Sequence, residues 1–542
     1  MPDAVVIGAG PNGLVAANRL ADAGWSVVVV EEQPEPGGAV RSGELVEPGF
    51  TSDRFSAFYP LGVASPALSA LRLEDYGLRW ARSANAVAHP TSDGSCAVVG
   101  PDLDATAASL DGFAPGDGDA WRRLYGLWER VGENVLGMLT TPFPPVRSAA
   151  GLALKFPPRE LLRLARIATL GVRRFATEEF RGAGGGRLLA GNALHADLSP
   201  EMTPSAVYGW VLCSLAQQVG FPAPVGGAGE LTAALVRRLR ARGGELVCGE
   251  RVVRVAVERR RAVGVELAGG GSLSASRAVL ADVDAPQLYL ELLPPEAVPA
   301  RVHDDLRRFE FDNATFKVDW TLDGPIPWAA PVARETGTIH VAEDMDFLTQ
   351  HAAELMMRRI PAAPYLVLGQ YSPVDRTRMP PGKEVAWAYT HVPQRPRGDA
   401  GPDGLEGKWD EREREVFVGR VEAQIERLAP GFRELIRARH VYAPPDFVAV
   451  DRNLRGGALN GGTSQLHQQL IFRPMPGLGR PETPVRRLYL CSAAIHPGGG
   501  VHGGCGEAGA RAALFWDRAR RTLPVAGAAA GLAVASRAAR RP

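Results

Sequence analysis

The sequence predicts an α/β fold, in which helices cover a parallel sheet, and three features near residue 1 support this prediction. A short apolar run at residues 5–7 leads into a G-x-G-x-x-G turn, which opens a helix-like segment over residues 11–23. A second apolar run at residues 27–30 ends at Glu31. Strand, glycine turn, helix, strand and terminal acid in this order predict a Rossmann-like βαβ unit that binds a dinucleotide.

Each glycine of the turn has a physical task. Gly8 lets the chain turn tightly out of the strand, Gly10 leaves room for a pyrophosphate, and Gly13 lets the helix pack close to the sheet. The first turn of that helix begins at Pro11, which has no N–H, and from Asn12 onward it offers unpaired backbone N–H groups to the phosphates. We therefore expect all five residues to bind the cofactor.

The residues after the second strand indicate which dinucleotide is bound. Glu31 stands where a carboxylate accepts hydrogen bonds from ribose hydroxyls, with the adjacent Glu32 as the alternative. Gly37 and Gly38 form a second glycine turn, and Arg41 follows three residues later. A flavin dinucleotide lying along the sheet needs this backbone clearance and a guanidinium near its phosphates. The pattern therefore favours FAD over NAD.

The far end of the chain repeats this kind of pattern. Residues 488–494 predict a strand, and residues 496–513 predict a glycine loop that opens a helix of small residues. Such a helix start allows the polar edge of a flat ring to approach closely. We expect this segment to hold the flavin through Gly499, Gly500, Val501 and Glu507.

At this point the chain resembles the phytoene desaturase-like FAD oxidoreductases of the amine oxidase superfamily, and within them the bacterial relatives of the pyridine nucleotide-disulphide oxidoreductase domain-containing protein 2 group. The resemblance rests on the segments already described and on residues 224–231 and 316–320, which together span nearly the whole chain. It implies FAD binding and redox chemistry, and it leaves the substrate open. In the resembled fold, the backbone of Val252 and Val253 contacts adenine.

The order of these patterns predicts a discontinuous FAD-binding domain. We assign residues 1–80, 223–300 and 476–520 to it. Residues 81–222 and 301–475 form an α+β substrate-covering domain in this interpretation, and residues 521–542 form a C-terminal tail. The apolar part of that tail, residues 525–535, is short and reads as a frayed terminus rather than an anchor.

Lys317 is the first candidate catalytic residue. Only four of the 61 basic residues are lysines, and this one lies within the apolar alternation of residues 316–320. A buried ammonium is costly unless it is paired or functional. The resemblance implies a strand lysine that holds water against flavin N5. The alternative is a lysine paired with Asp319 or Glu310 on an exposed strand face.

Histidines flank the predicted flavin loop. His496 and His502 could orient substrate or tune the flavin potential, or could simply bond to the loop backbone. Cys505 lies in the same loop, where it would fill a tight space or, less expectedly, attach the flavin covalently. His195 and Asp197, after a helical segment of the covering domain, are further candidates.

These features predict an FAD-dependent dehydrogenase or desaturase that moves a hydride between flavin and a C–C bond of a largely apolar substrate. An amine oxidase is the enzymatic alternative, with Tyr208, Trp210, Trp320 and Trp328 as residues for an aromatic cage. A flavin-binding regulatory protein with little turnover is a third hypothesis. The sequence holds one dinucleotide fingerprint and no C-x-x-x-x-C pair, so oxygen or a quinone is the expected electron acceptor.

Composition excludes some classes of partner and compartment. The net charge of +1 over 542 residues, without a basic block or zinc-ligand spacing, argues against a nucleic-acid partner or a metal site. The first strand begins within a few residues of Met1, so we expect no secretory signal. Five scattered cysteines fit a reducing compartment, and we expect a cytoplasmic protein.

Residues 158–175 predict an amphipathic helix. Apolar residues fall on one face and arginines largely on the other: Leu161, Leu164, Ala168, Val172 and Phe175 against Arg159, Arg163, Arg166, Arg173 and Arg174. This pattern is typical both of an ordinary covering helix and of a helix lying on an anionic membrane surface. Peripheral membrane contact is therefore a second, open expectation.

Overall fold

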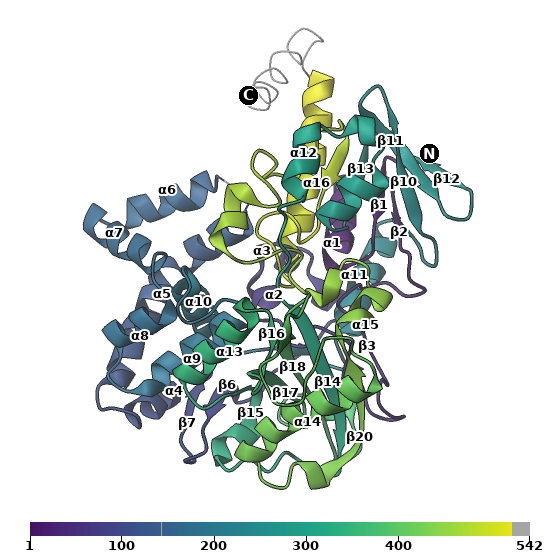
Figure 1. The fold of residues 1–542 in the computed structure, drawn as a ribbon. Coiled ribbons are helices and arrows are strands. Elements are labelled where there is room, and N and C mark those ends of the chain that lie inside the picture. Colours follow the sequence, from purple (N-terminus) through teal and green to yellow (C-terminus); the bar gives the residue numbers. More distant parts are fainter. Residues whose placement is uncertain (142–143, 523–542) are drawn as a thin grey trace.

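The computed structural model describes residues 1–141 and 144–522, and its first layer is a five-stranded parallel sheet. The strand order is β21-β13-β1-β2-β9, with β1 (Ala4–Ile7) at the centre. Its neighbours are β2 (Val27–Val30) and β13 (Ala278–Ala281), flanked by β9 (Glu245–Val247) and β21 (Leu488–Leu490). Strands from three distant stretches of sequence therefore build one sheet (Figure 1).

Alternate residues of this sheet belong to two different cores. Val6 and Val29 pack with α1 (Pro11–Asp22), α11 (Gly229–Ala241) and α16 (Gly504–Thr522) on one face. Val5 and Val30 pack on the other face with a three-stranded sheet made of β10 (Val252–Glu258), β11 (Arg261–Leu267) and β12 (Ser272–Ser274), and with α12 (Ala300–Leu306). Burial on both faces explains why these strands read as continuous apolar runs.

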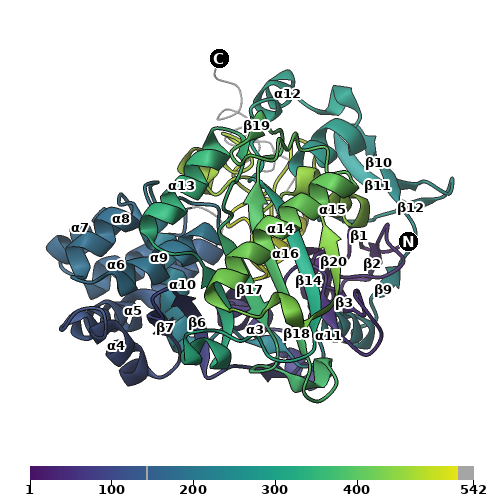
Figure 2. The same ribbon diagram turned by 60° about the horizontal axis from the view of Figure 1, so that its bottom comes forward.

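A second layer is the mixed seven-stranded sheet β20-β14-β18-β17-β15-β6-β7. Its strands, in chain order, are β6 (Asn85–Pro90), β7 (Cys96–Val99), β14 (Ala314–Leu322), β15 (Thr336–Val341), β17 (Leu366–Gln370), β18 (Glu384–Val392) and β20 (Ile436–Tyr442). Figure 2 shows α14 (Glu411–Leu428) lying across it. The fold class predicted from the sequence is confirmed.

Helices between β7 and β8 (Ala223–Pro224) cover the other face of the seven-stranded sheet and form the left side of Figure 1. They are α4 (Leu103–Asp111), α5 (Asp117–Thr140), α6 (Val146–Lys155), α7 (Pro158–Ile167), α8 (Val172–Glu179), α9 (Ala183–Leu194) and α10 (Ser205–Val219). The remaining larger elements are α2 (Pro60–Ala64), α3 (Pro66–Ser69), α13 (Met345–Met356) and α15 (Pro444–Val450), with the short strands β3 (Ser42–Gly43), β4 (Ser52–Asp53), β5 (Trp80–Ala81), β8 (Ala223–Pro224), β16 (Arg359–Ile360) and β19 (Gly398–Asp399).

The single amphipathic helix expected over residues 158–175 is wrong. The chain forms α7 and α8 instead, because Gly171 is extended and a Cβ there would lie 2.7 Å from the carbonyl oxygen of Pro200. The apolar residues of α8, Val172 and Phe175, are buried in the core. No helix within residues 1–141 and 144–522 is long and apolar enough to cross a bilayer. The predicted apolar tail at residues 525–535 lies outside the described residues.

A buried polar cluster joins the two layers. The Asp53 carboxylate accepts hydrogen bonds from the backbone N–H of Ala228 at 2.7 Å, from Arg378 at 2.7 Å and from the Tyr371 hydroxyl. Arg378 also donates to the carbonyl of Pro224 at 2.8 Å. The Asp53 and Arg378 side chains are fully buried. This cluster fixes the start of α11 against the seven-stranded sheet.

Candidate functional site

A cleft opens at the carboxyl ends of β1, β2 and β13, where an open parallel sheet usually binds its ligand. Eleven of the predicted cofactor residues line it: Gly8, Gly10, Pro11, Asn12, Glu31, Glu32, Gly38, Val252, Gly499, Gly500 and Val501. They come from the first βαβ unit, the second glycine turn, β10 and the loop before α16. The tertiary structure thus brings four distant segments to one crevice.

Close backbone packing explains the glycines of the cleft. Gly8 has a φ of +91°, and a Cβ on Gly10 would lie 2.8 Å from Asp282 Oδ2. A Cβ on Gly38 would lie 3.2 Å from the Cα of Gly10, so the two glycine turns touch. Asn12 Oδ1, at the start of α1, is buried and finds no hydrogen-bond partner among the described residues. The helix start therefore presents unused polar groups to the cleft.

Glu31 is held by backbone hydrogen bonds at the end of β2. Its carboxylate accepts one from the N–H of Ala9 at 2.7 Å and one from the N–H of Gln33 at 2.9 Å. Burial raises the pKa of Glu31, against the lowering effect of these bonds. Each oxygen keeps a further lone pair, so this rigid carboxyl group can still accept hydrogen bonds from a ribose.

Five predicted cofactor residues do not line this cleft. Gly13 donates its N–H to Asp282 at 2.7 Å. Gly37 lies in the second glycine turn with a φ of +123°. Arg41 donates to the carbonyls of Gly38 and Val450, so it braces the second glycine turn against α15. Val253 points outward on β10. Glu507 pairs with Arg19 at 2.7 Å and with Arg511 at 2.6 Å, on the α1–α16 contact.

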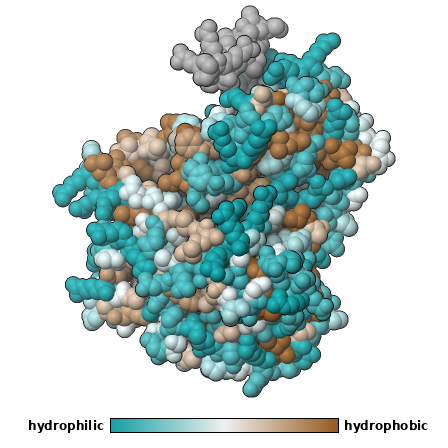
Figure 3. All heavy atoms as spheres, in the orientation of Figure 1, coloured by the Kyte–Doolittle hydropathy of each residue, from teal (hydrophilic) through white to brown (hydrophobic). Residues whose placement is uncertain are grey.

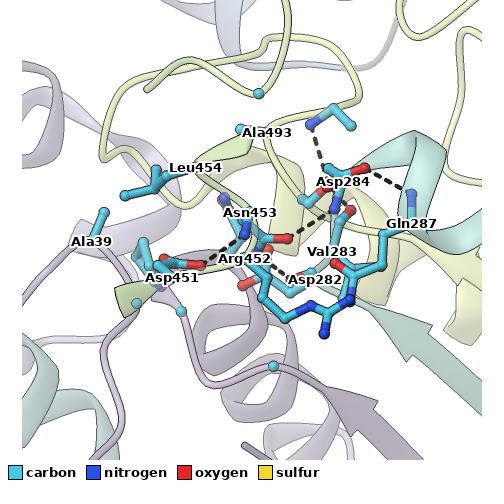
Figure 4. Close-up of a pocket in the computed structure, with 18 of the residues that line it drawn as sticks. Ala39, Asp282, Val283, Asp284, Gln287, Asp451, Arg452, Asn453, Leu454 and Ala493 are labelled. Carbon is cyan, nitrogen blue, oxygen red and sulfur yellow. Dashed lines mark hydrogen bonds between the residues drawn. The ribbon is translucent and has the colours of Figure 1, made fainter. Parts of the chain in front are cut away.

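Acidic residues that sequence reasoning missed form one wall of the cleft (Figure 4). Asp282 and Asp284 follow β13, and Asp451 follows α15. Asn453 joins them, because its side chain donates to the Asp282 carbonyl at 3.0 Å and accepts from the Asp284 N–H at 2.9 Å. Acids placed directly after a buried parallel strand were the available signal for Asp282 and Asp284.

Burial keeps this acidic wall from carrying its full charge. It raises the pKa of Asp282 to about 8, and the nearby Asp451 and Glu31 add to that rise. Burial likewise raises the pKa of Asp451 and of Asp284, although Arg455 lies 3.2 Å from Asp284 and opposes the shift. A neutral Asp282 can accept from Gly13 and still donate an O–H to a phosphate oxygen.

A second, mainly apolar cavity of about 340 Å³ meets the cleft at Ala39, Leu459 and residues 499–501. Its wall comes from the loop before α2, the end of α5, α10 and the seven-stranded sheet. Aromatic residues in that wall are Phe55, Phe58, Tyr59, Tyr208, Phe221, Trp387, Tyr389 and Phe447. A cavity of this size and lining is typical of a small-molecule site.

Lys317 lies on β14 in the wall of the apolar cavity, and its side chain is 3% exposed. Its ammonium donates to both oxygens of Asp319 at 2.5 Å and to the carbonyl of Asp53 at 3.0 Å. Burial raises the pKa of Asp319 to about 6, and Lys317 limits the rise. Of the two partners expected for Lys317, Asp319 forms the ion pair, whereas Glu310 lies beside His467. The strand that carries Lys317 is buried and not exposed as expected.

The two loop histidines have different surroundings. His502 lines the apolar cavity, and its Nδ1 accepts the N–H of Gly504 at 3.0 Å. His496 lies with Nε2 3.3 Å from the carbonyl oxygen of Met138, away from both cavities. Burial lowers the pKa of His502 to about 4 and also that of His496, so both are neutral at pH 7. Neither is a ready proton donor.

The remaining candidate residues lie in different places in the structure. His195 lines the apolar cavity, whereas Asp197 accepts hydrogen bonds from Asn313 and lies in a different, polar pocket. Cys505 lines neither cavity: its thiol faces the carbonyls of Ile495 and Gly498, and burial raises its pKa to about 12. Of the four aromatic residues proposed for a cage, Tyr208 alone lines the cavity.

This fold and this pair of cavities are those of a dinucleotide-binding oxidoreductase with an apolar cavity beside the cofactor cleft. The chain matches the profile of the flavin containing amine oxidoreductases over residues 12–514, and it therefore belongs to this family. It is an FAD-dependent enzyme of the phytoene desaturase-like type.

Known proteins agree with this assignment over almost their full lengths. The mouse (Mus musculus) pyridine nucleotide-disulfide oxidoreductase domain-containing protein 2 is 29% identical, covering 93% of this chain and 92% of the relative. The lycopene-forming phytoene desaturase of Pseudescherichia vulneris is 28% identical, with coverages of 95% and 99%. An oxidoreductase structure from Methanosarcina mazei has a TM-score of 0.61 and 16% identity, covering 94% of this chain and 99% of that one, which shows a shared fold.

The residues of the cleft fit FAD. The start of α1 and the cleared space at Gly10 suit the pyrophosphate, Glu31 suits a ribose, and residues 499–501 suit the ring at the junction with the apolar cavity. When bound, FAD supplies hydride transfer. The residues of the cleft would hold the cofactor, and the apolar cavity would position a molecule beside it.

FAD affinity should depend on pH through Asp282. Because its pKa is raised from 3.8 to about 8, the carboxyl group is neutral at pH 7 and becomes charged between pH 7 and 9. The charge would then repel the pyrophosphate, and we expect roughly tenfold weaker FAD binding to the apoprotein at pH 9. Fluorescence titration with FAD across this range measures the effect.

Asp282→Asn should remove this pH step, and Asp284→Asn, beside Arg455, should leave it in place. The same carboxyl group affects stability. Because the pKa of Asp282 is raised in the folded state, its neutral form favours folding below pH 4, and this contribution to the free energy of unfolding is lost as the pH rises to about 8. The Asn variant should therefore lose less stability than the wild type between pH 4 and 8. If the pH dependence of FAD binding is unchanged in Asp282→Asn, another group is responsible for it.

Lys317→Met should destabilise the protein, because it leaves the buried Asp319 without its partner. We expect a loss of about 3–5 kcal/mol in the free energy of unfolding, recovered in part by the double variant Lys317→Met/Asp319→Asn. Chemical denaturation measures both values. Unchanged stability in the single variant would contradict a structural role.

Proposed function

We propose that this flavoenzyme dehydrogenates a largely apolar small molecule at a C–C bond. The observation that carries the proposal is the junction of the two cavities at Gly499, Gly500 and Val501. A substrate in the apolar cavity would reach the reactive part of FAD only there, where the loop carries no large side chain. The relative named as a phytoene desaturase supports a substrate of this class.

The cavity wall supports chemistry that needs orientation more than acid or base groups. His502 is neutral, and the Lys317 ammonium already donates three hydrogen bonds. A dry apolar chamber positions an unreactive C–H bond and keeps water from the reaction. We propose that Lys317 supplies a fixed positive charge beside the reacting centre, and that oxygen or a quinone takes the electrons.

Amine oxidation is the second candidate function, and one observation favours it. Trp387 and Tyr389 both line the apolar cavity on β18, with ring centroids 6.1 Å apart and an interplanar angle of 13°. Parallel aromatic rings of this kind can hold the substituents of a neutral amine or the π-system of an alkene. The same cavity wall therefore suits both functions, which differ in the class of substrate that is oxidised.

Anaerobic bleaching of the bound flavin decides between these functions. We expect terpenoids and polyenes to bleach it, and primary or polyamine substrates to leave it oxidised. Val207→Trp, which fills the apolar cavity from α10, should retain FAD and bleach at least tenfold more slowly. Leu290→Trp, at an exposed position, is the matched control and should bleach normally. Bleaching by amines alone would replace the proposal with amine oxidation.

We also propose that the enzyme is cytoplasmic and contacts a membrane surface through α6 and α7. Neither helix has a buried residue, and Leu154 and Leu162 are 89% and 72% exposed. Figure 3 shows apolar side chains gathered in this region. Exposed basic residues accompany them: Arg147, Lys155, Arg159, Arg163 and Arg166. Exposed apolar side chains accompanied by exposed cationic side chains are typical of helices that lie on an anionic membrane surface.

The position of this face supports substrate uptake from the bilayer. Helix α6 packs on α5, and the last turns of α5, at Leu136, Leu139 and Thr140, line the apolar cavity. An apolar substrate leaving the membrane at α6 would thus be close to the chamber. The free cysteines among the described residues agree with a reducing compartment.

Sedimentation with vesicles tests the membrane contact. Wild-type protein should bind vesicles that contain about 30% phosphatidylglycerol and should bind neutral vesicles weakly, since arginine and lysine attract anionic lipid. Leu154→Glu/Leu162→Glu should reduce binding at least tenfold, because it places charge on the apolar face. Leu290→Glu/Met357→Glu, exposed elsewhere, should bind normally. Equal loss in both variants would contradict a specific face.

A further inference from the structure

Two histidines meet in the wall of the apolar cavity. His195 caps the C-terminus of α9 and lines the cavity, and His340 lies fully buried on β15. Their Nε2 atoms are 3.0 Å apart, so one ring donates this hydrogen bond and the other accepts it. The Nδ1 atom of His195 makes no hydrogen bond to any described residue, and it is the free polar atom of this ring.

The site that holds His340 is shaped for an imidazole. A Cβ on Gly191 would lie 2.1 Å from His340 Nδ1, so α9 has a glycine where the ring packs. The Tyr365 hydroxyl donates to the Gly191 carbonyl at 2.9 Å, and its ring lies 5.9 Å from the His340 ring. The His89 ring is also 5.9 Å away, at an interplanar angle of 80°. Packing therefore fixes the direction in which His340 meets His195.

Both rings of this pair are neutral. Burial lowers the pKa of His195 to about 3 and that of His340 well below its usual value. A neutral imidazole carries one N–H and one lone pair. His340 Nδ1 is buried and has no hydrogen-bond partner among the described residues.

This orphan nitrogen sets the tautomers. A buried N–H without an acceptor is rarer and costlier than an unused lone pair, so His340 Nδ1 carries the lone pair. The His340 proton is then on Nε2 and is donated to Nε2 of His195. By elimination, the proton of His195 is on Nδ1. His195 thus has an unused donor, Nδ1–H, on a ring that lines the cavity.

A second unused polar group lies in the same wall. Thr338 precedes His340 by two residues, so both side chains lie on the same face of β15. Thr338 Oγ1 is buried, lines the cavity and has no hydrogen-bond partner among the described residues. Apolar residues such as Phe221 and Val367 line the same cavity. An entirely hydrocarbon ligand would leave both polar groups unsatisfied, which costs free energy.

We propose that His195 Nδ1–H and the Thr338 hydroxyl form a polar anchor that binds an acceptor oxygen of the substrate. The substrate is then an apolar molecule with one hydroxyl, ether or carbonyl oxygen, not a pure hydrocarbon. The oxygen is held at the sheet wall, apart from the bond presented at residues 499–501. This inference rests on the proposed dehydrogenation and names its substrate class.

Binding of a matched pair of probes to the FAD-loaded enzyme tests the anchor. The probes are 2-undecanone and undecane, which differ in one carbonyl oxygen, and the readout is the shift of the flavin absorbance or of the protein's tryptophan fluorescence on titration. The ratio of the two dissociation constants is compared between variants, because this cancels the different solubility of the probes. We expect the wild type to favour the ketone by roughly threefold to tenfold relative to His195→Leu, as one net hydrogen bond implies.

His195→Asn is the matched control, since its amide can place an N–H near the position of imidazole Nδ1. It should keep most of the preference for the ketone, whereas His195→Leu should lose it. Phe221→Leu, whose native ring lies 6.3 Å from that of His195, should weaken both probes equally. Thr338→Val should reduce the preference without removing it.

Equal ratios in wild type and His195→Leu would overturn the anchor. If His195→Leu does not fold, a reduced preference in Thr338→Val supports the anchor, and an unchanged ratio there overturns it. The test is separate from the proposed dehydrogenation, because binding is read without turnover. A His195-dependent ratio in an enzyme whose flavin no terpenoid bleaches would retain the anchor and refute the proposed reaction.

Discussion

The fully buried ion pair between Asp53 and Arg378 is the interaction on which the arrangement of the two layers depends. Asp53 lies in the hairpin that follows the second glycine turn, and Arg378 lies on the segment between β17 and β18. Neither charge is stable in this position without the other, because each has lost its hydration. The pair therefore requires the FAD-binding layer and the seven-stranded sheet to meet in one orientation.

Further contacts extend this constraint to both cavities. The same carboxylate receives the N–H of Ala228 and so fixes the start of α11, while its backbone carbonyl receives Lys317. Lys317 in turn neutralises Asp319, which lies beside Asp53. The charges in the chamber wall are thus paired within the architecture, and the space they enclose is left mainly apolar. This explains how an apolar chamber can adjoin a cleft built for a charged cofactor.

The same principle, burial without free charge, operates in the cofactor cleft and at the polar anchor. Carboxyl groups beside a pyrophosphate would oppose binding if they were ionised, and burial raises their pKa values instead. Buried histidines in the sheet wall have lowered pKa values and so act as neutral donors and acceptors. Recognition in this enzyme therefore depends on hydrogen-bond direction more than on charge.

The sequence by itself predicted the parallel sheet and the dinucleotide cleft, and the strands of that sheet do come from separate stretches of the chain. Local patterns suffice there, because a glycine turn, an apolar strand and a terminal acid have physical tasks that depend on near neighbours. Gly8, Gly10 and Glu31 belong to this group, and they line the cleft. The glycine loop at residues 499–501 was predicted from the same kind of local pattern, and it lies where the cleft meets the apolar cavity.

The tertiary structure decided what local patterns do not encode. Glu507 and Arg41 have the residue types of cofactor ligands, but packing partners distant in sequence, Arg19 and the carbonyl of Val450, engage them instead. The isolated amphipathic pattern of residues 158–175 gave no sign that Gly171 must pass close to Pro200. The contact of Lys317 with the Asp53 carbonyl and the meeting of His195 with His340 depend on which strands and helices become neighbours. Side-chain roles were thus set by long-range packing, because a charge or imidazole takes its chemistry from whatever surrounds it after folding.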